Sequence, residues 1–131
     1  MPLIPKLQSF LIADSVFQQK SGKWCIIGIF DRIFVKQFPA LHHSLGLFIV
    51  VSDAQGDYSV KVEFRNAADQ ILALFEGIQL SIQDRLANVG FGVQTHNLVI
   101  PSPGKYYFKL YLNNEVLDDR PVEAVQMEPV Q

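Results

Sequence analysis

The sequence has little of what usually marks a secreted, membrane-bound or nucleic-acid-binding protein. It contains one cysteine, Cys25, so no disulfide can form within the chain. Its uninterrupted apolar runs are far shorter than the ~20 residues that a membrane-spanning helix needs. Charged residues make up 18% of the chain, the formal net charge is -2, and no basic block occurs. This charge pattern predicts neither nucleic acid nor an anionic membrane as a partner.

The N-terminal segment lacks the apolar core of a signal peptide, because two prolines interrupt its first ten residues. A cytoplasmic location is therefore expected. The 131 residues are 49% hydrophobic and include ten phenylalanines, a globular composition of ordinary single-domain size. We expect one domain over residues 1–131, with flexible tails at 1–7 and 126–131.

A strict period of two marks the clearest strand, Tyr58–Arg65. Its apolar residues Val60, Val62 and Phe64 alternate with polar ones, the pattern of a half-buried strand. The preceding run, 45–51, is apolar throughout and predicts a buried central strand. Turn residues at 53–57 lie between the two runs, so we expect these strands to form a hairpin.

The same alternation recurs near the C-terminus, over Tyr106–Leu112. Asn113 and Asn114 follow, and asparagine tolerates the left-handed conformation of a tight hairpin turn. The returning segment, 115–125, contains Pro121, which cannot donate a hydrogen bond to a neighbouring strand. We therefore expect 115–125 to be an edge strand or to carry a bulge at that proline.

Further strands are expected at 8–17, at 24–30 as a second central strand, at 78–82 and at 93–100. Residues 67–76 are predicted as a turn followed by a strand, and 84–88 as a loop. About eight short strands at these spacings are typical of a sandwich. The predicted fold class is all-β: a two-sheet antiparallel sandwich of the immunoglobulin-like kind.

Three segments together resemble a known family. They are LIADSVFQQKSGKWCIIGIFDRIFV at 11–35, the Phe-Pro-Ala at 38–40, and PGKYYFKLYLNNEVLDDRPVEAV at 103–125. These are similar to an uncharacterised bacterial family of immunoglobulin-like β-sandwich proteins of this length. The resemblance implies the same fold. It implies no activity, because no activity is assigned to that family.

Metal-binding motifs are weak in this sequence. His42 and His43 are adjacent in a segment expected to be a loop, and adjacent side chains of an extended chain point to opposite sides. Catalytic zinc needs three convergent ligands. The acidic pairs 53/57 and 118/119 fall short of the six to eight oxygens that calcium takes. No metal and no cofactor is expected.

Catalytic and carrier motifs are equally sparse. Cys25 lies in an apolar run and is expected to be a buried, unreactive thiol. No nucleophile elbow and no phosphate-binding glycine loop occurs. Gly22-Lys-Trp24 resembles the lipocalin G-x-W signature, but a turn glycine before a core tryptophan explains it better. An enzyme is not expected.

Two surfaces remain as low-specificity candidates for binding. If Phe108 faces the core, then Tyr107, Lys109 and Tyr111 stand together on the outside, where tyrosines favour interfaces. The alternative is that the stem of the lysine simply packs between two rings. Asp31 and Arg32 form either a structural corner or a partner-binding pair.

These observations leave the function open between three classes. The first is a non-enzymatic interaction or structural module that binds another protein or its own copy. The second is a carrier that holds a small apolar molecule between the sheets, as the phenylalanine content allows. The third is an unrecognised hydrolase.

Overall fold

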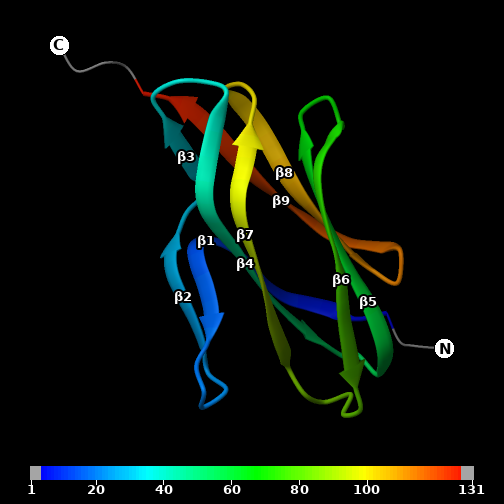
Figure 1. Cartoon of the computed structure of the whole chain (residues 1–131). Coiled ribbons are helices and arrows are strands. Elements are labelled where there is room, and N and C mark those ends of the chain that lie inside the picture. The colour runs from blue at the N-terminus through cyan, green and yellow to red at the C-terminus, as the bar shows by residue number, and fades with distance from the viewer. Residues whose placement is uncertain (1–3, 128–131) are drawn as a thin grey trace.

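A computed structural model describes residues 4–127, and within this range the chain consists of strands and short connections with no helix (Figure 1). The all-β prediction is therefore confirmed. Nine strands follow in chain order: β1 (Lys6–Gln18), β2 (Trp24–Ile29), β3 (Arg32–Val35), β4 (Ala40–Ser52), β5 (Gly56–Asn66), β6 (Ile71–Ile82), β7 (Val89–Ile100), β8 (Gly104–Leu112) and β9 (Glu115–Gln126).

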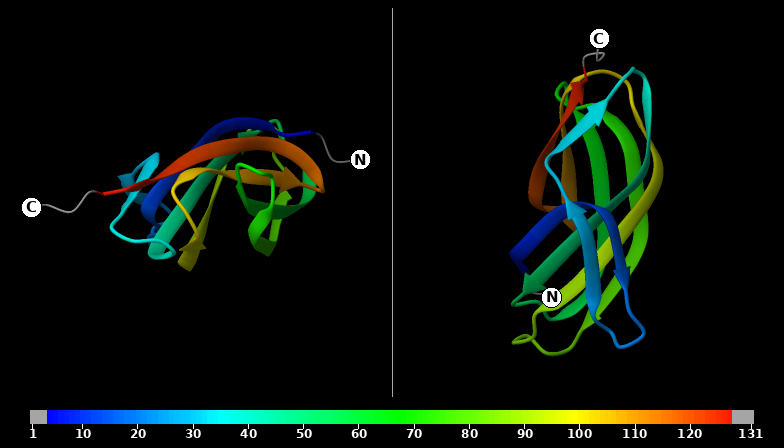
Figure 2. Two further views of the ribbon diagram at one scale, coloured as in Figure 1. Left: turned by 90° about the horizontal axis from the view of Figure 1, so that it is seen from above. Right: turned by 90° about the vertical axis from the view of Figure 1, so that its left-hand side faces the viewer.

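The strands form two sheets. Sheet A has the order β2-β1-β4-β7 and sheet B the order β3-β9-β8-β5-β6. Figure 2 shows that both are strongly curled, each approaching a half-barrel, so the immunoglobulin-like arrangement is not confirmed. The pairing is also not wholly antiparallel, because β3 runs parallel to β9.

The core lies between the sheets and follows from period-two alternation. Along β8, every second side chain, from Tyr106 to Leu112, is buried, while Tyr107, Lys109 and Tyr111 are only half-buried. The same alternation on β5 buries Val60, Val62 and Phe64. The ring centroid of Phe108 lies 4.9 Å from that of Phe64. This tilted ring contact joins β5 and β8 on the core side of sheet B.

The β1–β2 hairpin forms an arm that departs from sheet A. β1 pairs with β4 only as far as Ala13, and beyond that point it pairs with β2 alone. Glycines on β4 and β7 make room for the side chains of this arm. A Cβ at Gly92 would lie 2.8 Å from both Trp24 and Val16, and one at Gly46 would lie 2.6 Å from Val16. The arm therefore packs on the outer side of sheet A, against bare backbone.

Two predictions about the front half are wrong. Residues 24–30 are not a central strand, because β2 is the edge of sheet A and exposes Ile27 and Ile29. Cys25 on this strand is half-buried rather than buried, and the side-chain amide of Gln19 donates to its Sγ at 3.2 Å. Trp24, at the start of the run, packs against Phe48 at a centroid distance of 5.6 Å.

The predicted hairpin between 45–51 and 58–65 is also wrong. β4 pairs with β1 and β7, whereas β5 pairs with β6 and β8. The turn at Asp53, whose φ is 55°, carries the chain from one sheet to the other. A turn signal alone does not distinguish a hairpin from a crossing between sheets.

The C-terminal hairpin is confirmed. Asn113 and Asn114 have φ values of 50° and 65°, and β8 and β9 pair on either side of them. The bulge in β9 falls at Leu117, however, and not at Pro121. β9 is an interior strand only at its end, because β3 pairs with it from Glu123 onward. Pro121 therefore lies where, among residues 4–127, one side of β9 has no neighbouring strand.

The remaining boundaries differ in detail. His42 and His43 lie in β4 and not in a loop. The turn-then-strand prediction at 67–76 is confirmed, although β6 continues without a break through 78–82, past a bulge near Gly77. Of the predicted tails, residues 1–3 and 128–131 lie outside the described range. Residues 6–7 belong to β1, and residue 126 belongs to β9.

Candidate functional site

The outer face of sheet B, the side turned away from the core, carries a cluster of polar side chains centred on Glu63. β5 pairs with β8 in a register that sets Glu63 opposite Lys109, Lys61 opposite Tyr111, and Arg65 opposite Tyr107. Residues directly opposite in an antiparallel pair share a face, so these six side chains lie on one surface. This is the Glu63 cluster.

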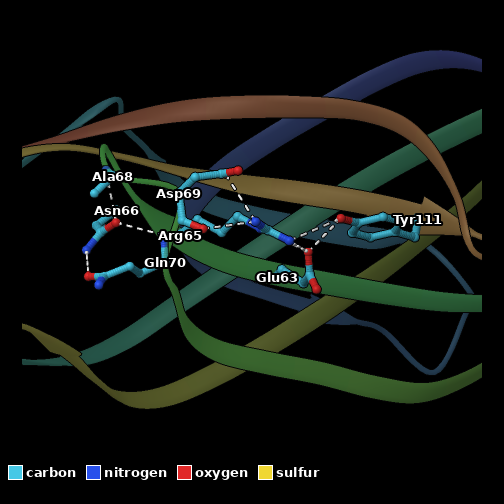
Figure 3. Close-up of polar contacts among 7 residues, drawn as sticks. All are labelled: Glu63, Arg65, Asn66, Ala68, Asp69, Gln70 and Tyr111. Carbon is cyan, nitrogen blue, oxygen red and sulfur yellow. Dashed lines mark hydrogen bonds and ion pairs between the residues drawn. The ribbon is translucent and has the colours of Figure 1, made fainter.

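Figure 3 shows Arg65 and Tyr111 converging on the carboxylate of Glu63. The Tyr111 hydroxyl donates to Glu63 Oε1 at 2.6 Å. Arg65 donates to the same oxygen from Nη2 at 2.6 Å and from Nε at 3.0 Å. Glu63 is only 6% exposed, although it lies on the outward side of the sheet. The two longer side chains therefore cover the carboxylate and hold each other in place.

The electrostatics of the cluster follow from this arrangement. Burial alone would raise the pKa of Glu63, but the hydrogen bonds from Tyr111 and Arg65, together with the charges of Arg65 and Lys61, lower it below its usual value. Burial and the bond to the Glu63 carboxylate raise the pKa of Tyr111. The hydrogen bond to Glu63 likewise raises the pKa of Arg65. At neutral pH the cluster is an ion pair with a protonated phenol.

The β5–β6 turn fixes the other end of Arg65. Arg65 Nη1 bonds to the backbone oxygen of Asp69 at 3.0 Å and pairs with its carboxylate at 3.1 Å. The turn is itself closed by Asn66, whose Oδ1 accepts from the backbone N–H groups of Ala68 and Gln70 (Figure 3). A guanidinium held at both ends has little rotational freedom left to lose on binding.

Two lysine ammonium groups lie near the Tyr111 ring. Lys61 Nζ lies 4.3 Å from the ring centroid and Lys109 Nζ lies 5.9 Å from it. Both distances are within reach of a cation–π interaction. The predicted grouping of Tyr107, Lys109 and Tyr111 on one outer surface thus agrees with the structure. The Lys109 ammonium lies near the Tyr111 ring alone, whereas the alternative interpretation placed the lysine stem between the two rings.

Apolar side chains border the cluster. Ile71, Leu72 and Leu74 on β6 are 52%, 36% and 47% exposed, and β6 is the edge strand of sheet B. Val116 on β9, 55% exposed, lies opposite Tyr111. In the described residues no strand pairs with the free side of β6. A charged centre is therefore flanked by apolar residues along an uncovered edge.

Asp31 and Arg32 lie away from the cluster, where the chain passes from sheet A to sheet B. The Phe30 N–H donates to the Ile12 oxygen in sheet A at 2.9 Å, and the Glu123 N–H donates to the Asp31 oxygen in sheet B at 3.0 Å. This geometry is that of the predicted structural corner. Arg32 lies opposite Glu123 and lines a shallow pocket of about 260 Å³.

Sequence reasoning missed Glu63, Arg65 and the apolar residues of β6 as parts of this surface. The signal was present, because Lys61, Glu63 and Arg65 are the polar positions of the strongest alternating strand. The contact of Glu63 and Arg65 with Tyr111 could not be predicted from this alternation. It depends on the register between β5 and β8, which brings together Glu63 and Tyr111, 48 residues apart in the chain.

The Glu63 carboxylate should make stability sensitive to acid. The pKa of Glu63 is lowered in the folded state. Its contribution to the free energy of unfolding is therefore present above the usual pKa of 4.5 and is lost as the pH falls through the lowered pKa. Urea unfolding at pH 7 and at several values below 4.5 should show Glu63→Gln less stable than wild type at pH 7, with a gap that narrows in acid. The exposed Glu115→Gln is the control and should follow wild type throughout. A difference in the free energy of unfolding between wild type and Glu63→Gln that stays constant with pH would contradict a lowered pKa for Glu63.

Residues 8–125 match the family of unknown function DUF6941. The chain belongs to this family. The match covers nearly the whole chain, including both sheets and the Glu63 cluster, and it confirms the predicted resemblance to an uncharacterised family. No curated protein matches the sequence.

Among solved structures, this DUF6941 chain is similar to the alkylpurine DNA glycosylase AlkC of Pseudomonas fluorescens bound to DNA containing an abasic site analogue. The TM-score is 0.60 at 12% sequence identity, and the match covers 92% of this chain and 30% of that one. At this identity the likeness shows the fold alone, and this chain corresponds to less than a third of the glycosylase. It nevertheless contradicts our prediction that nucleic acid is not a partner, because the similar structure is a DNA complex.

The described part of this DUF6941 chain contains neither a metal-ligand group nor a membrane-spanning helix. No three His, Cys, Asp or Glu side chains in residues 4–127 lie close enough together to hold a metal ion. Over the same range no helix is long and apolar enough to cross a membrane.

Proposed function

We propose that this chain is a non-enzymatic interaction module that binds a second copy of itself through the outer face of sheet B. The observation that carries the proposal is the Glu63 cluster bordered by exposed apolar residues of β6 and β9. Glu63, Arg65 and Tyr111 are already hydrogen-bonded to one another, which suits a docking surface better than a reacting centre.

Preorganisation supports this role. Binding normally costs free energy because interface side chains lose rotamer freedom. Arg65 and Tyr111 are already fixed by hydrogen bonds to Glu63. Tyrosine and arginine are also the residue types that contribute most often to binding hot spots, when they lie centrally and are surrounded by contacts that exclude water. Ile71, Leu74 and Val116 are placed to supply those contacts.

The charge pattern favours a protein surface with the same pattern. Across the strands, Asp119, Lys109 and Glu63 form one row of alternating sign, and Glu123 and Lys105 form another. Tyr107 and Pro121 lie opposite each other between these rows. A two-fold axis through such a face can set positive groups against negative ones, as an isologous interface requires.

The test is sedimentation equilibrium of wild type and of Tyr107→Glu/Leu74→Glu. We expect a dimer for wild type and a dissociation constant at least about 100-fold weaker for the double variant, since one residue of the cluster and one of its apolar border both acquire a charge that the interface would bury. Phe17→Glu is the matched control. This aromatic residue is also half-exposed, at 46%, but it lies on the β1–β2 arm of sheet A. It should leave the dimer intact.

A dimer that survives the double variant would show that the face is wrong. Nucleic acid is tested in parallel by the anisotropy of a labelled single-stranded DNA oligonucleotide. Self-association would be overturned if wild type is a monomer that binds this oligonucleotide and the double variant Lys61→Gln/Lys109→Gln does not bind it. That result would assign the same face to nucleic acid instead.

A further inference from the structure

A pocket of about 600 Å³ lies at the end of the molecule where β3 turns into β4, far from the Glu63 cluster in the chain. Its walls come from the end of β3, the 36–39 connection, the start of β4 and residue 127, which follows β9. The Met127 N–H donates to the Val35 oxygen at 2.8 Å and so closes one side of the pocket. This volume falls within the range of small-molecule sites.

The walls of the pocket include three large apolar side chains that are exposed. Phe34 is 58% exposed, Leu41 50% and Met127 38%. The alternating pattern of β3 explains part of this, because Ile33 fills the core and leaves Phe34 on the other side. Three large apolar side chains around one hollow provide a surface for an aromatic or branched aliphatic body.

The charge of the pocket has one sign. Among its described lining residues, Lys36 is the permanently charged side chain, and no Asp or Glu is present. His42 also lines the pocket. Burial lowers its pKa, against the opposing effects of Asp14 and a backbone bond to Ser44, so the imidazole is neutral at neutral pH. Its Nε2 is buried, and none of the described residues bonds to it. An unpaired buried nitrogen costs free energy, so packing alone does not account for a histidine at this position.

We infer that this pocket binds a small amphipathic anion, an aromatic or branched aliphatic carboxylate or sulfonate. Its apolar body lies against Phe34, Leu41 and Met127, and its acid group faces Lys36. The site is at the end of the molecule rather than between the sheets, where the carrier alternative placed its ligand. It is independent of self-association, because none of its residues belongs to the Glu63 cluster.

The probe is 8-anilinonaphthalene-1-sulfonate, titrated by fluorescence, with the uncharged N-phenyl-1-naphthylamine beside it. Lys36→Gln should weaken sulfonate binding about tenfold, roughly one charge-assisted hydrogen bond, and leave the uncharged probe unaffected. Leu41→Ser should weaken both probes. Lys20→Gln and Phe17→Ser remove a lysine and a large apolar side chain from the β1–β2 arm, away from the pocket. They should change the affinity for neither probe.

Amide chemical shifts locate the probe independently. With the sulfonate bound, the largest changes in the 15N spectrum should fall at residues 34–43. Shifts confined to the β1–β2 arm, equal affinity of Lys36→Gln and wild type for the sulfonate, or equal losses of both probes in Lys36→Gln would each overturn the inference.

Discussion

Phe108→Ala is expected to lower the free energy of unfolding by about 3–5 kcal/mol, the usual cost of removing a fully buried phenylalanine ring. Phe108 is completely buried, in the middle of β8. Its ring packs on Phe64, which in turn stacks on Tyr106 at a centroid distance of 5.3 Å. The cavity would therefore open within the stack that joins β5 to β8. Urea unfolding followed by circular dichroism measures the loss.

The matched control for this variant is Phe17→Ala. Phe17 is 46% exposed on the β1–β2 arm and contributes much less to the buried core. Its truncation should cost well under half as much. If the two variants lost the same free energy, the core would not lie between the sheets in the way the structure places it.

Gly92→Val is expected to detach the β1–β2 arm from sheet A. The added Cβ would lie 2.8 Å from carbon atoms of Trp24 and Val16, closer than van der Waals contact allows. Overpacking of this kind costs about 1–3 kcal/mol. Because Trp24 is the only tryptophan, its fluorescence reports directly on the arm. The emission should shift to longer wavelength as the indole becomes exposed to water.

Two further variants make this result specific. Val99→Ala lies on the same strand at an exposed position and should change neither stability nor emission. Adding Val16→Ala to Gly92→Val removes one of the two clashing side chains and should recover part of the stability. An unshifted emission in Gly92→Val would mean that the arm does not pack on this glycine.

The parts of the fold that could be predicted from sequence are those with local causes. The alternation of Tyr106–Leu112 reflects a strand with one buried face, and the asparagine pair at 113–114 provides the conformation that the turn needs. Tyr107, Lys109 and Tyr111 could be placed on one surface for the same reason.

The incorrect predictions involved relations between distant segments. An apolar run such as 24–30 looks the same whether it is central or lies at an edge and packs on glycines of another strand. The Glu63 cluster joins two strands whose pairing no local signal reports. The 600 Å³ pocket likewise depends on a chain crossing that brings residue 127 beside β3.

The central claim, that the outer face of sheet B joins two copies of this chain, is tested most directly by isotope-filtered NOE spectroscopy on a mixture of 13C-labelled and unlabelled protein. This measurement detects only contacts between different copies. We predict intermolecular contacts from the rings of Tyr107 and Tyr111 and from the methyl groups of Ile71, Leu74 and Val116. Intermolecular contacts that come instead from Ile27 and Ile29 on the arm, or no intermolecular contacts at millimolar concentration, would contradict it.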